Sequence, residues 1–179
     1  MKRIKEMSLG ELAAYVCTHL EKNGIHCVLT GGACVSIYTE NRYMSYDLDF
    51  IENLASDRTD IIKALFEIGF LEDNKYFKNP DTQYILEFPT GPLSIGFEPV
   101  NEPNILEFET GRLLLLSPTD CIKDRLAAYY HWNDKQCLEQ AIMITEDNQI
   151  DLDEIQRWSE QEKKLLEFNL IKEKLVSKK

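Results

Sequence analysis

The stretch RYMSYDLDF, residues 42–50, carries the pattern on which the fold and function of this 179-residue chain depend. Its last four residues alternate between acidic and apolar, which is typical of a half-buried β-strand. Asp47 and Asp49 therefore share one face of a strand, about 6–7 Å apart at Cα, while Leu48 and Phe50 face the core. Two carboxylates held on a rigid element suit a hard cation such as Mg²⁺. The alternative is an exposed edge strand with two surface acids.

A second motif lies upstream, where the strand expected over residues 25–30 ends at Gly31-Gly32. Two glycines let the backbone approach a ligand closely, because no Cβ stands in the way. A short helix expected over residues 33–38 would present free N–H groups and the positive end of its dipole at this turn, which favours a phosphate. A purely structural turn is the alternative for the glycines taken alone.

The strand expected over residues 83–88 contains one acid, Glu87, in an otherwise apolar run. A lone carboxylate at such a position faces solvent or points into a site. Beside Asp47 and Asp49, it would complete a nest of three carboxylates that holds two metal ions for in-line phosphoryl or nucleotidyl transfer. A calcium-binding EF-hand starting at Asp47 is excluded, because the sixth position of that loop must be glycine and is Glu52 here.

The remaining periodicities predict an α+β protein, in which a mixed β-sheet is flanked by helices and followed by a helical C-terminal tail. Ser8 and Glu11 form a capping box at the start of the first helix, and Asn23-Gly24 ends it. Ser117-Pro118, an N-cap followed by proline at the first helical position, begins the helical C-terminal tail. Further helices are expected over residues 57–68, 118–130, 134–145, 151–159 and 160–176, and strands over 46–51, 93–97, 105–108 and 112–116.

Two details of this assignment can be checked directly. The helix over residues 57–68 should turn Ile61, Ile62, Leu65 and Phe66 inward, because they recur at helical spacing. The turn Gly91-Pro92 should join the strands over 83–88 and 93–97 as a hairpin. We expect one compact unit, with an α/β core over residues 1–117 and a helical region over residues 118–179 packed on it.

Composition describes a folded, soluble chain, with 44% hydrophobic and 28% charged residues. No apolar run approaches the ~20 residues of a membrane span, and no apolar signal segment follows the basic N-terminus. These features predict a cytoplasmic protein without membrane contact. The five cysteines are odd in number and form no C-x-x-C pair, so we expect buried free thiols rather than a zinc cluster or disulfides.

The net charge of −11 lies entirely within residues 1–150, because residues 151–179 hold seven basic and seven acidic side chains. Such a surface repels polyanions in general. A nucleic-acid contact would need a local basic patch, and a small substrate or a basic partner is favoured.

Taken together, Thr30-Gly31-Gly32, Asp47-Leu48-Asp49 and Glu87 resemble the pattern of the DNA polymerase β-like nucleotidyltransferase superfamily. Its minimal members share a Gly-Gly or Gly-Ser turn, an acid-x-acid strand and a third acid on a neighbouring strand. Residues 42–49 are most similar to the abortive-infection and toxin-type branch, in which an arginine and a serine or threonine precede the acids. The resemblance covers residues 25–90 and implies a nucleotidyltransferase-like mixed sheet.

The resemblance also implies a role for each motif. Gly31 and Gly32 would hold the triphosphate of a nucleoside triphosphate. Asp47 and Asp49 would bind two Mg²⁺ (or Mn²⁺) ions, one of which neutralises the leaving pyrophosphate. Glu87 would bind the second ion or take the proton from the attacking hydroxyl.

Three further residues are nucleotide contacts by the same resemblance, namely Arg42, Ser45 and Lys123. Arg42 would meet the phosphates, and Lys123 is similar to a basic residue that contacts phosphate from the following helix in toxin-type relatives. Lys123 also lies one turn after Asp120, so an ordinary ion pair is the alternative. If the phosphate role is real, one of Lys123 and Arg125 on this helix should face the cleft. Ala33 departs from the family, because many relatives carry a hydroxyl residue there, and this departure implies weaker nucleotide binding.

Two functions remain open at this point. The first is a metal-dependent enzyme that transfers a nucleoside monophosphate to a hydroxyl of RNA, protein or a small molecule, with a toxin-like role and a partner protein as further possibilities. The second is a catalytically degenerate module that binds nucleotide or docks a partner. Three acids in the expected order favour the enzyme, whereas the acidic surface and Ala33 favour the module.

Overall fold

The structure is a computed structural model that describes residues 2–52, 57–100 and 102–176. Within these ranges a seven-stranded mixed sheet has the order β3-β4-β5-β2-β1-β9-β8, and β6 and β7 form a separate pair. The strands are β1 (Cys27–Thr30), β2 (Asp47–Glu52), β3 (Leu71–Asp73), β4 (Tyr76–Lys78), β5 (Ile85–Glu87), β6 (Ser94–Ile95), β7 (Glu98–Pro99), β8 (Asn104–Phe108) and β9 (Gly111–Leu115).

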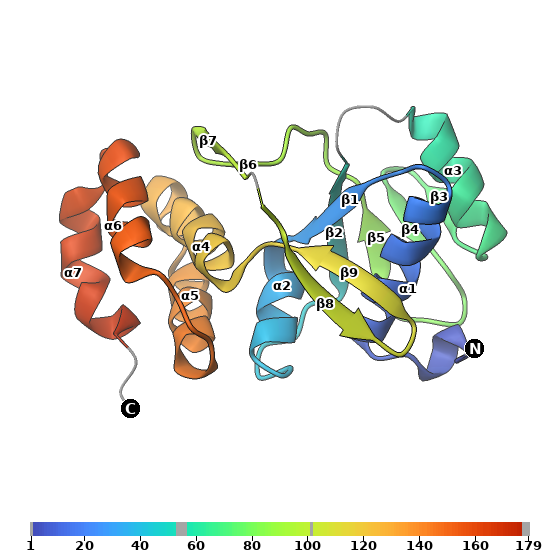
Figure 1. The fold of residues 1–179 in the computed structure, drawn as a ribbon, viewed down its shortest axis with the longest axis horizontal. Helices are drawn as coiled ribbons and strands as arrows, with labels where there is room; N and C mark the ends of the chain where they lie inside the picture. The colour runs from blue at the N-terminus through green and yellow to red at the C-terminus, as the bar shows by residue number, and fades with distance from the viewer. Residues whose placement is uncertain (1, 53–56, 101, 177–179) are drawn as a thin grey trace.

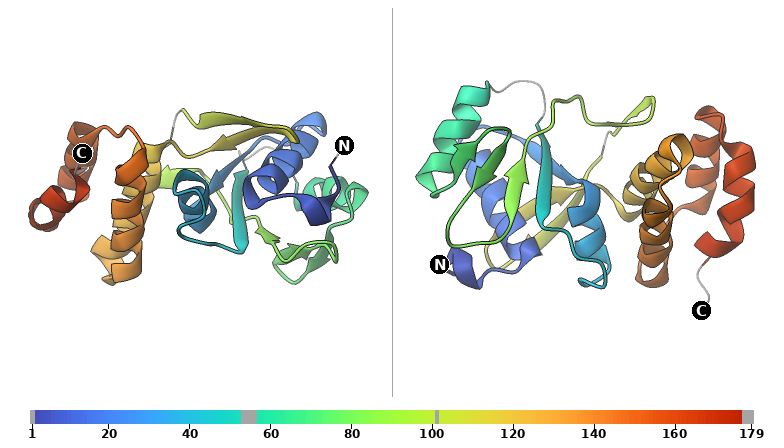
Figure 2. Two further views of the ribbon diagram at one scale, coloured as in Figure 1. Left: turned by 90° about the horizontal axis from the view of Figure 1, so that it is seen from below. Right: turned by 180° about the vertical axis from the view of Figure 1, so that it is seen from behind.

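The helices fall into two groups. Those beside the sheet are η1 (Ile4–Glu6), α1 (Leu9–Lys22), α2 (Gly31–Tyr38) and α3 (Arg58–Glu67), and those that follow it are α4 (Pro118–Trp132), α5 (Lys135–Asp147), α6 (Leu152–Gln161) and α7 (Leu165–Leu175). The second group gathers at one end of the molecule with the C-terminus, and the N-terminus lies at the other end (Figures 1 and 2). Both α4 and α5 contact α2, which therefore lies between the sheet and the helical group.

The local sequence signals explain most of these elements. Ser8 caps α1 and exchanges hydrogen bonds with Glu11, so the predicted capping box is present. Ser117 caps α4 in the same way, because its hydroxyl accepts from the backbone N–H of Asp120, and Pro118 occupies the first turn. The predicted helices and the predicted pair β8–β9 are confirmed, with ends that differ by a few residues.

Burial alternates along the central strands as the sequence predicts. Leu48 and Phe50 of β2 are fully buried, whereas Asp47 is exposed and Asp49 is partly buried. Leu48 pairs in register with Leu86 of β5, which pairs with Phe77 of β4, and all three are fully buried. One face of β2, β5 and β4 is therefore core, and the other is open.

Two expectations about the middle of the chain are wrong. Phe66 is 66% exposed instead of facing inward, while Ile61 and Leu65 are buried as predicted. The turn Gly91-Pro92 does not close a hairpin with β5. Both edges of β5 are already taken, by β2 in parallel and by β4 in antiparallel, so β6 pairs with β7 instead. The hairpin β3–β4 that supplies one of these partners was not predicted.

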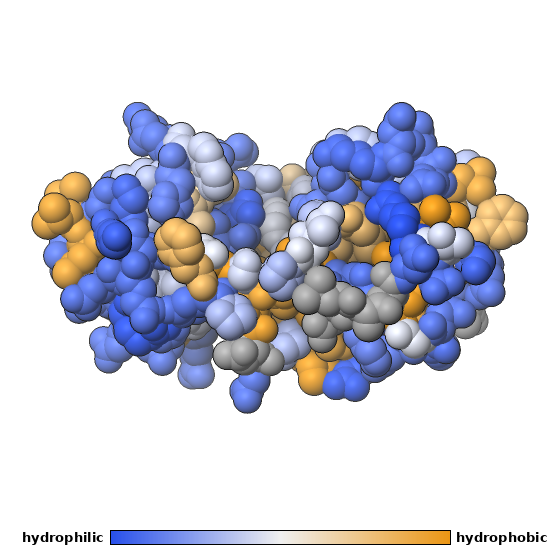
Figure 3. Space-filling model, turned by 90° about the horizontal axis from the view of Figure 1, so that it is seen from above, coloured by the Kyte–Doolittle hydropathy of each residue, from blue (hydrophilic) through white to orange (hydrophobic). Residues whose placement is uncertain are grey.

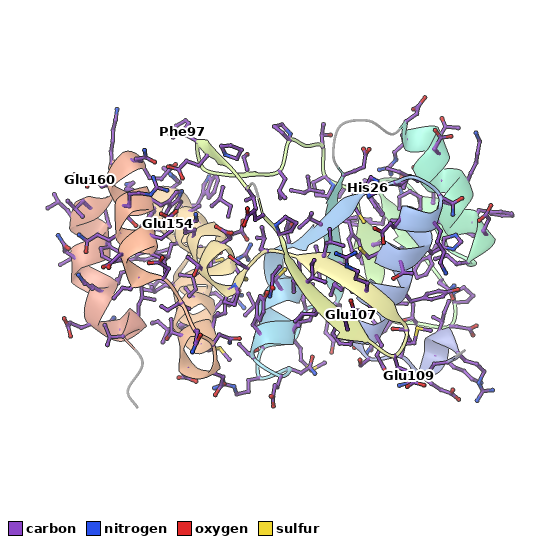
Figure 4. The ribbon with its side chains drawn as sticks, in the orientation of Figure 1. His26, Phe97, Glu107, Glu109, Glu154 and Glu160 are labelled. Atoms are coloured by element: carbon purple, nitrogen blue, oxygen red, sulfur yellow. The ribbon has the colours of Figure 1, made fainter. Side chains whose placement is uncertain are left out.

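The hairpin β6–β7 reaches away from the sheet and is fixed to the helical group (Figure 1). The indole N–H of Trp158 on α6 donates to the carbonyl of Ile95 at 3.2 Å. The backbone N–H of Phe97 donates to the carboxylate of Glu162 at 2.9 Å. Phe97 itself lies at the tip of the hairpin, above Glu154 and Glu160 of α6 in the view of Figure 4. We call residues 94–99 the strap, because they connect the two parts of the chain.

The surface and the thiols agree with the composition. All five cysteines are buried and free, as predicted. Hydrophilic residues cover most of the face seen in Figure 3, and the hydrophobic ones are scattered over it. None of the helices in the described ranges combines the length and the apolar character that crossing a membrane requires.

Trp158 provides a test of the contact between the strap and the helices. Its side chain is fully buried and stacks on Tyr130 at 5.9 Å between ring centroids. Trp158→Ala should lower the free energy of unfolding by about 3–5 kcal/mol, because it leaves a cavity and an unpaired carbonyl at Ile95. The control is Trp132→Ala, since Trp132 is 77% exposed, and it should change stability by less than about 0.5 kcal/mol. Equal effects in urea unfolding would contradict this assignment.

Candidate active site

The three predicted acids lie on the open face of the sheet. Asp49 of β2 and Glu87 of β5 are register partners on neighbouring parallel strands, and Asp47 precedes Asp49 by two residues. Register partners point to the same side of a sheet, as do residues two apart on a strand. The strands thus put Asp47, Asp49 and Glu87 on one face, as we expect for a shared site.

The Gly31-Gly32 turn lies directly against these acids. Gly31 has a φ of +68°, and a Cβ on it would stand 2.6 Å from Oδ2 of Asp49. A Cβ on Gly32 would stand 3.2 Å from Oγ of Ser45. The turn therefore needs glycine at its first position for both backbone conformation and space. It also opens α2, so the first N–H groups of that helix, which have no partner within the helix, lie at the turn.

Ser45 organises the start of β2. Its hydroxyl donates to the carbonyl of Asp47 at 3.1 Å, and its backbone N–H donates to the hydroxyl of Ser36 on α2 at 2.8 Å. These bonds join the strand that carries the acids to the helix behind the glycine turn. Ser45 is thus placed beside the turn, and its predicted contact with nucleotide stays a prediction.

The electrostatics of the acids are dominated by Asp49. Burial raises its pKa to about 6, and repulsion from Glu87 and then from Asp47 adds to the rise. Arg125 of α4 opposes this, because its positive charge lowers the pKa of Asp49. An ionised Asp49 is therefore costly in the protein alone, and a cation placed at this face would relieve the repulsion.

Two cations border the acids, and one of them is Arg125, which the sequence offered beside Lys123 as a residue facing the site. Arg125 is largely buried and is held by Asp124 and by the side-chain oxygen of Gln140 at 3.4 Å. Lys75, in the turn between β3 and β4, contacts Oε1 of Glu87 at 2.7 Å. Arg125 belongs to a helix that was predicted, whereas Lys75 belongs to a hairpin that was not.

Lys123 and Arg42 have other partners in this structure. Lys123 is 8% exposed and pairs with Asp120 at 2.8 Å and with Glu154 at 3.1 Å. Burial lowers its pKa, but the hydrogen bonds to these two carboxylates outweigh burial and raise it. The ion pair with Asp120 that was the alternative for Lys123 is thus present. Arg42 pairs with two acids at the end of α5, Glu146 and Asp147.

The donor set suits a hard divalent cation, because carboxylate oxygens are its preferred ligands and their mutual repulsion helps to raise the pKa of Asp49 despite Arg125. The side chains as they stand are not closed around one point. Within residues 2–52, 57–100 and 102–176, no three carboxylate, thiol or imidazole groups are close enough to share an ion. Binding would need Glu87 to turn from Lys75 toward Asp49, which its position on the same face permits.

No protein-family model matches the sequence, and no curated protein matches it. Among solved structures, the chain is similar to the crystal structure of an antigenic nucleotidyltransferase-like protein from Paracoccidioides brasiliensis. The TM-score is 0.61, 94% of each chain is covered, and the sequences are 13% identical. Two structures of the antibiotic-resistance factor ANT(2'')-Ia overlap less. Its solution structure has a TM-score of 0.47 at 12% identity and covers 76% of this chain and 81% of the other.

The second structure of ANT(2'')-Ia is a complex with adenylyl-2''-tobramycin, with a TM-score of 0.46 at 12% identity over 73% of this chain and 83% of the other. At these identities the comparison establishes the fold. The chain has the nucleotidyltransferase-like α+β fold that the sequence predicts, with a mixed sheet flanked by helices. Membership of the abortive-infection and toxin-type branch stays a prediction, and so do the roles of the site residues.

The contact between Gly31 and Asp49 can be measured with a matched glycine. Gly24 has a similar φ of +76°, but a Cβ on it would meet nothing within 4 Å. Gly31→Ala should therefore destabilise the protein by about 2 kcal/mol or more beyond Gly24→Ala, because only the former adds a clash to backbone strain. In an Asp49→Ala background the excess should shrink. An excess that survives this second change would place its origin elsewhere.

The raised pKa of Asp49 predicts a specific dependence of stability on pH. The folded protein holds this proton up to about pH 6, whereas the unfolded chain releases it near pH 4. Stability should thus fall as the pH rises from about 4 to 6, and Asp49→Asn should remove this loss. In metal-free buffer, the variant should gain up to about 3 kcal/mol relative to the wild type between pH 4 and pH 8. A constant difference across that range would show that the pKa is not raised.

Proposed function

We propose that this chain is a metal-dependent nucleotidyltransferase, which transfers a nucleoside monophosphate from a nucleoside triphosphate to a hydroxyl acceptor. The observation that supports this most is the register of β2 and β5, which puts Asp47, Asp49 and Glu87 on one open face. The Gly31 turn contacts that same face through Asp49. Carboxylates beside a glycine turn at a helix N-terminus suit a metal-bound triphosphate.

The donor would bind across the glycine turn. The N–H groups at the start of α2 would donate to its phosphate oxygens, and the absence of a Cβ at Gly31 and Gly32 would let them approach. Arg125 would add a fixed positive charge beside Asp49. Ser45, Arg42 and Lys123 stay candidate contacts, and the latter two would have to leave their present carboxylate partners.

Asp47, Asp49 and Glu87 would hold Mg²⁺ or Mn²⁺, which supplies the positive charge that stabilises the triphosphate as it reacts. In the reaction, the acceptor oxygen forms a bond to the α-phosphorus and the bond to the pyrophosphate oxygen breaks. Glu87 would take the hydroxyl proton, and its position at the side of Asp49 away from the glycine turn supports this role. The acceptor stays open among RNA, a protein and a small molecule.

A degenerate nucleotide-binding or partner-docking module is the second candidate. It is favoured by the ion pair between Glu87 and Lys75, which occupies the third acid. It is also favoured by the lack, in the described ranges, of three side chains already arranged for a metal. A toxin-like role with a partner protein is compatible with either of these two functions.

Asparagine substitutions separate the two. Asp47→Asn and Asp49→Asn should each reduce nucleotidyl transfer by about 10³-fold or more, because they remove charge at the reacting centre and leave the size of the side chain unchanged. The assay incubates the protein with each labelled nucleoside triphosphate, Mg²⁺ or Mn²⁺, and a cell extract as the pool of acceptors. Asp60→Asn is the control, because Asp60 lies on α3 and pairs with Lys63 on the surface.

The outcomes are distinct. Transfer that disappears in both site variants and persists in Asp60→Asn supports the enzyme. Triphosphate binding without transfer to any acceptor supports the module. A wild type that neither binds triphosphate nor is stabilised by Mg²⁺ or Mn²⁺ contradicts both candidates.

A further inference from the structure

The open face of the sheet carries a row of side chains that runs across the strands. Register pairs join Thr30 to Asp49, Asp49 to Glu87, and Glu87 to Tyr76 of β4. Because neighbouring strands lie about 4.8 Å apart, the row extends about 14 Å. One end adjoins the Gly31-Gly32 turn, and the other end is Tyr76. The catalytic acids of the proposed site are thus in the middle of the row.

Lys75 covers the far end of this row. Its ammonium group lies 2.7 Å from Oε1 of Glu87 and 4.8 Å from the centre of the Tyr76 ring. The Lys75 side chain is 62% exposed, and the side chain of Glu87 is 21% exposed. An ion pair with one such exposed partner contributes little to stability, so Lys75 is free to exchange Glu87 for a ligand.

The geometry of the displacement indicates which substrate binds at the Tyr76 end of the row. Displacement at the α-phosphorus is in line, so the attacking hydroxyl and the leaving pyrophosphate lie on opposite sides of it. If the pyrophosphate lies at the Gly31-Gly32 turn, the acceptor must approach over Glu87, from the side of Tyr76 and Lys75. Any acceptor that reaches Glu87 by this route passes the tyrosine ring and the ammonium group.

Lys75 and Tyr76 favour an acceptor of one chemical class. A tyrosine ring offers a stacking surface for a planar base, and an ammonium group binds a phosphate. A single ammonium group matches about one phosphate, and Asp73, the register partner of Tyr76, is already paired with Lys78. A cationic acceptor gains nothing from Lys75.

We propose that Lys75 and Tyr76 form the acceptor subsite, and that the acceptor is a single nucleotide unit. Its base stacks on Tyr76, and its phosphate replaces Glu87 as the partner of Lys75. The exchange releases the Glu87 carboxylate next to the acceptor hydroxyl, whose proton Glu87 takes as the oxygen attacks the α-phosphorus. The inference rests on the proposed function and adds the acceptor class to it. The unit is either a free nucleoside monophosphate or the end of a short strand.

The test is equilibrium binding, measured by calorimetry for each ribonucleoside monophosphate. The donor site is first saturated with an α,β-methylene nucleoside triphosphate and Mg²⁺. Lys75→Ala should weaken monophosphate binding about tenfold, because it removes one charge-assisted contact. Tyr76→Leu should weaken it to a similar extent, whereas Lys75→Arg should retain most of it. A trinucleotide titrated in parallel distinguishes a strand end from a free nucleotide.

Lys78→Ala is the matched control. Lys78 belongs to the same hairpin, is similarly exposed, and pairs with Asp73 at 2.7 Å. It should bind monophosphate as the wild type does. All variants should bind the triphosphate analogue within twofold of the wild type, and their melting temperatures verify that the hairpin is folded.

Each outcome decides a separate point. Monophosphate binding that is equal in Lys75→Ala and the wild type overturns the subsite while the proposed function stands. Transfer to a cationic amino sugar, without transfer to any nucleotide, also overturns the subsite and leaves the proposed function standing. A wild type that does not bind the triphosphate analogue overturns the proposed function, and the subsite with it.

Discussion

The parallel pairing of β2 with β5 is the constraint on which both the core and the candidate site depend. Its register puts Leu48 beside Leu86 in the buried layer and Asp49 beside Glu87 on the open face. A slip of one residue would exchange these faces and bury carboxylates in place of leucines. The hydrophobic effect therefore fixes the register, and the position of the acids is a result of it.

The site is nevertheless unfavourable for the folded chain. Asp49 lies partly buried beside two other carboxylates, and the glycine turn packs directly on it. A protein that needed only stability would place an amide or an apolar residue there. The arrangement is intelligible if a cation and a phosphate are bound during function, because the charge that destabilises the protein alone then becomes the source of affinity.

The sequence predicts those parts of the structure that local physics decides. Alternation identifies β2, the capping residues Ser8 and Ser117 locate α1 and α4, and the order of the motifs predicts the fold. The hairpin β3–β4 escapes detection, because its strands have three residues each and Leu71–Asp73 is exposed throughout. Too few residues repeat to reveal a period of two.

For a related reason, the sequence missed Lys75 and left the choice between Lys123 and Arg125 open. Lys75 is brought to Glu87 by the undetected hairpin, and Arg125 reaches Asp49 through the packing of α4 on α2. Neither approach leaves a local pattern in the sequence, because it depends on contacts between distant segments. The family resemblance named Lys123 as the phosphate contact and left Arg125 as the other residue that could face the site, and packing gives Lys123 two carboxylate partners of its own.

The strap has a consequence for any attempt to divide the chain. Ile95 and Glu98 precede residue 117 in the sequence, but their partners Trp158 and Arg157 follow it. A fragment that stops at residue 117 would carry a hairpin without its anchor, and the complementary fragment would expose the indole that the hairpin covers. The two parts differ in architecture, but each needs the other to cover its exposed surface. A recombination that replaced the helical group alone would therefore also have to replace the strap that packs on it.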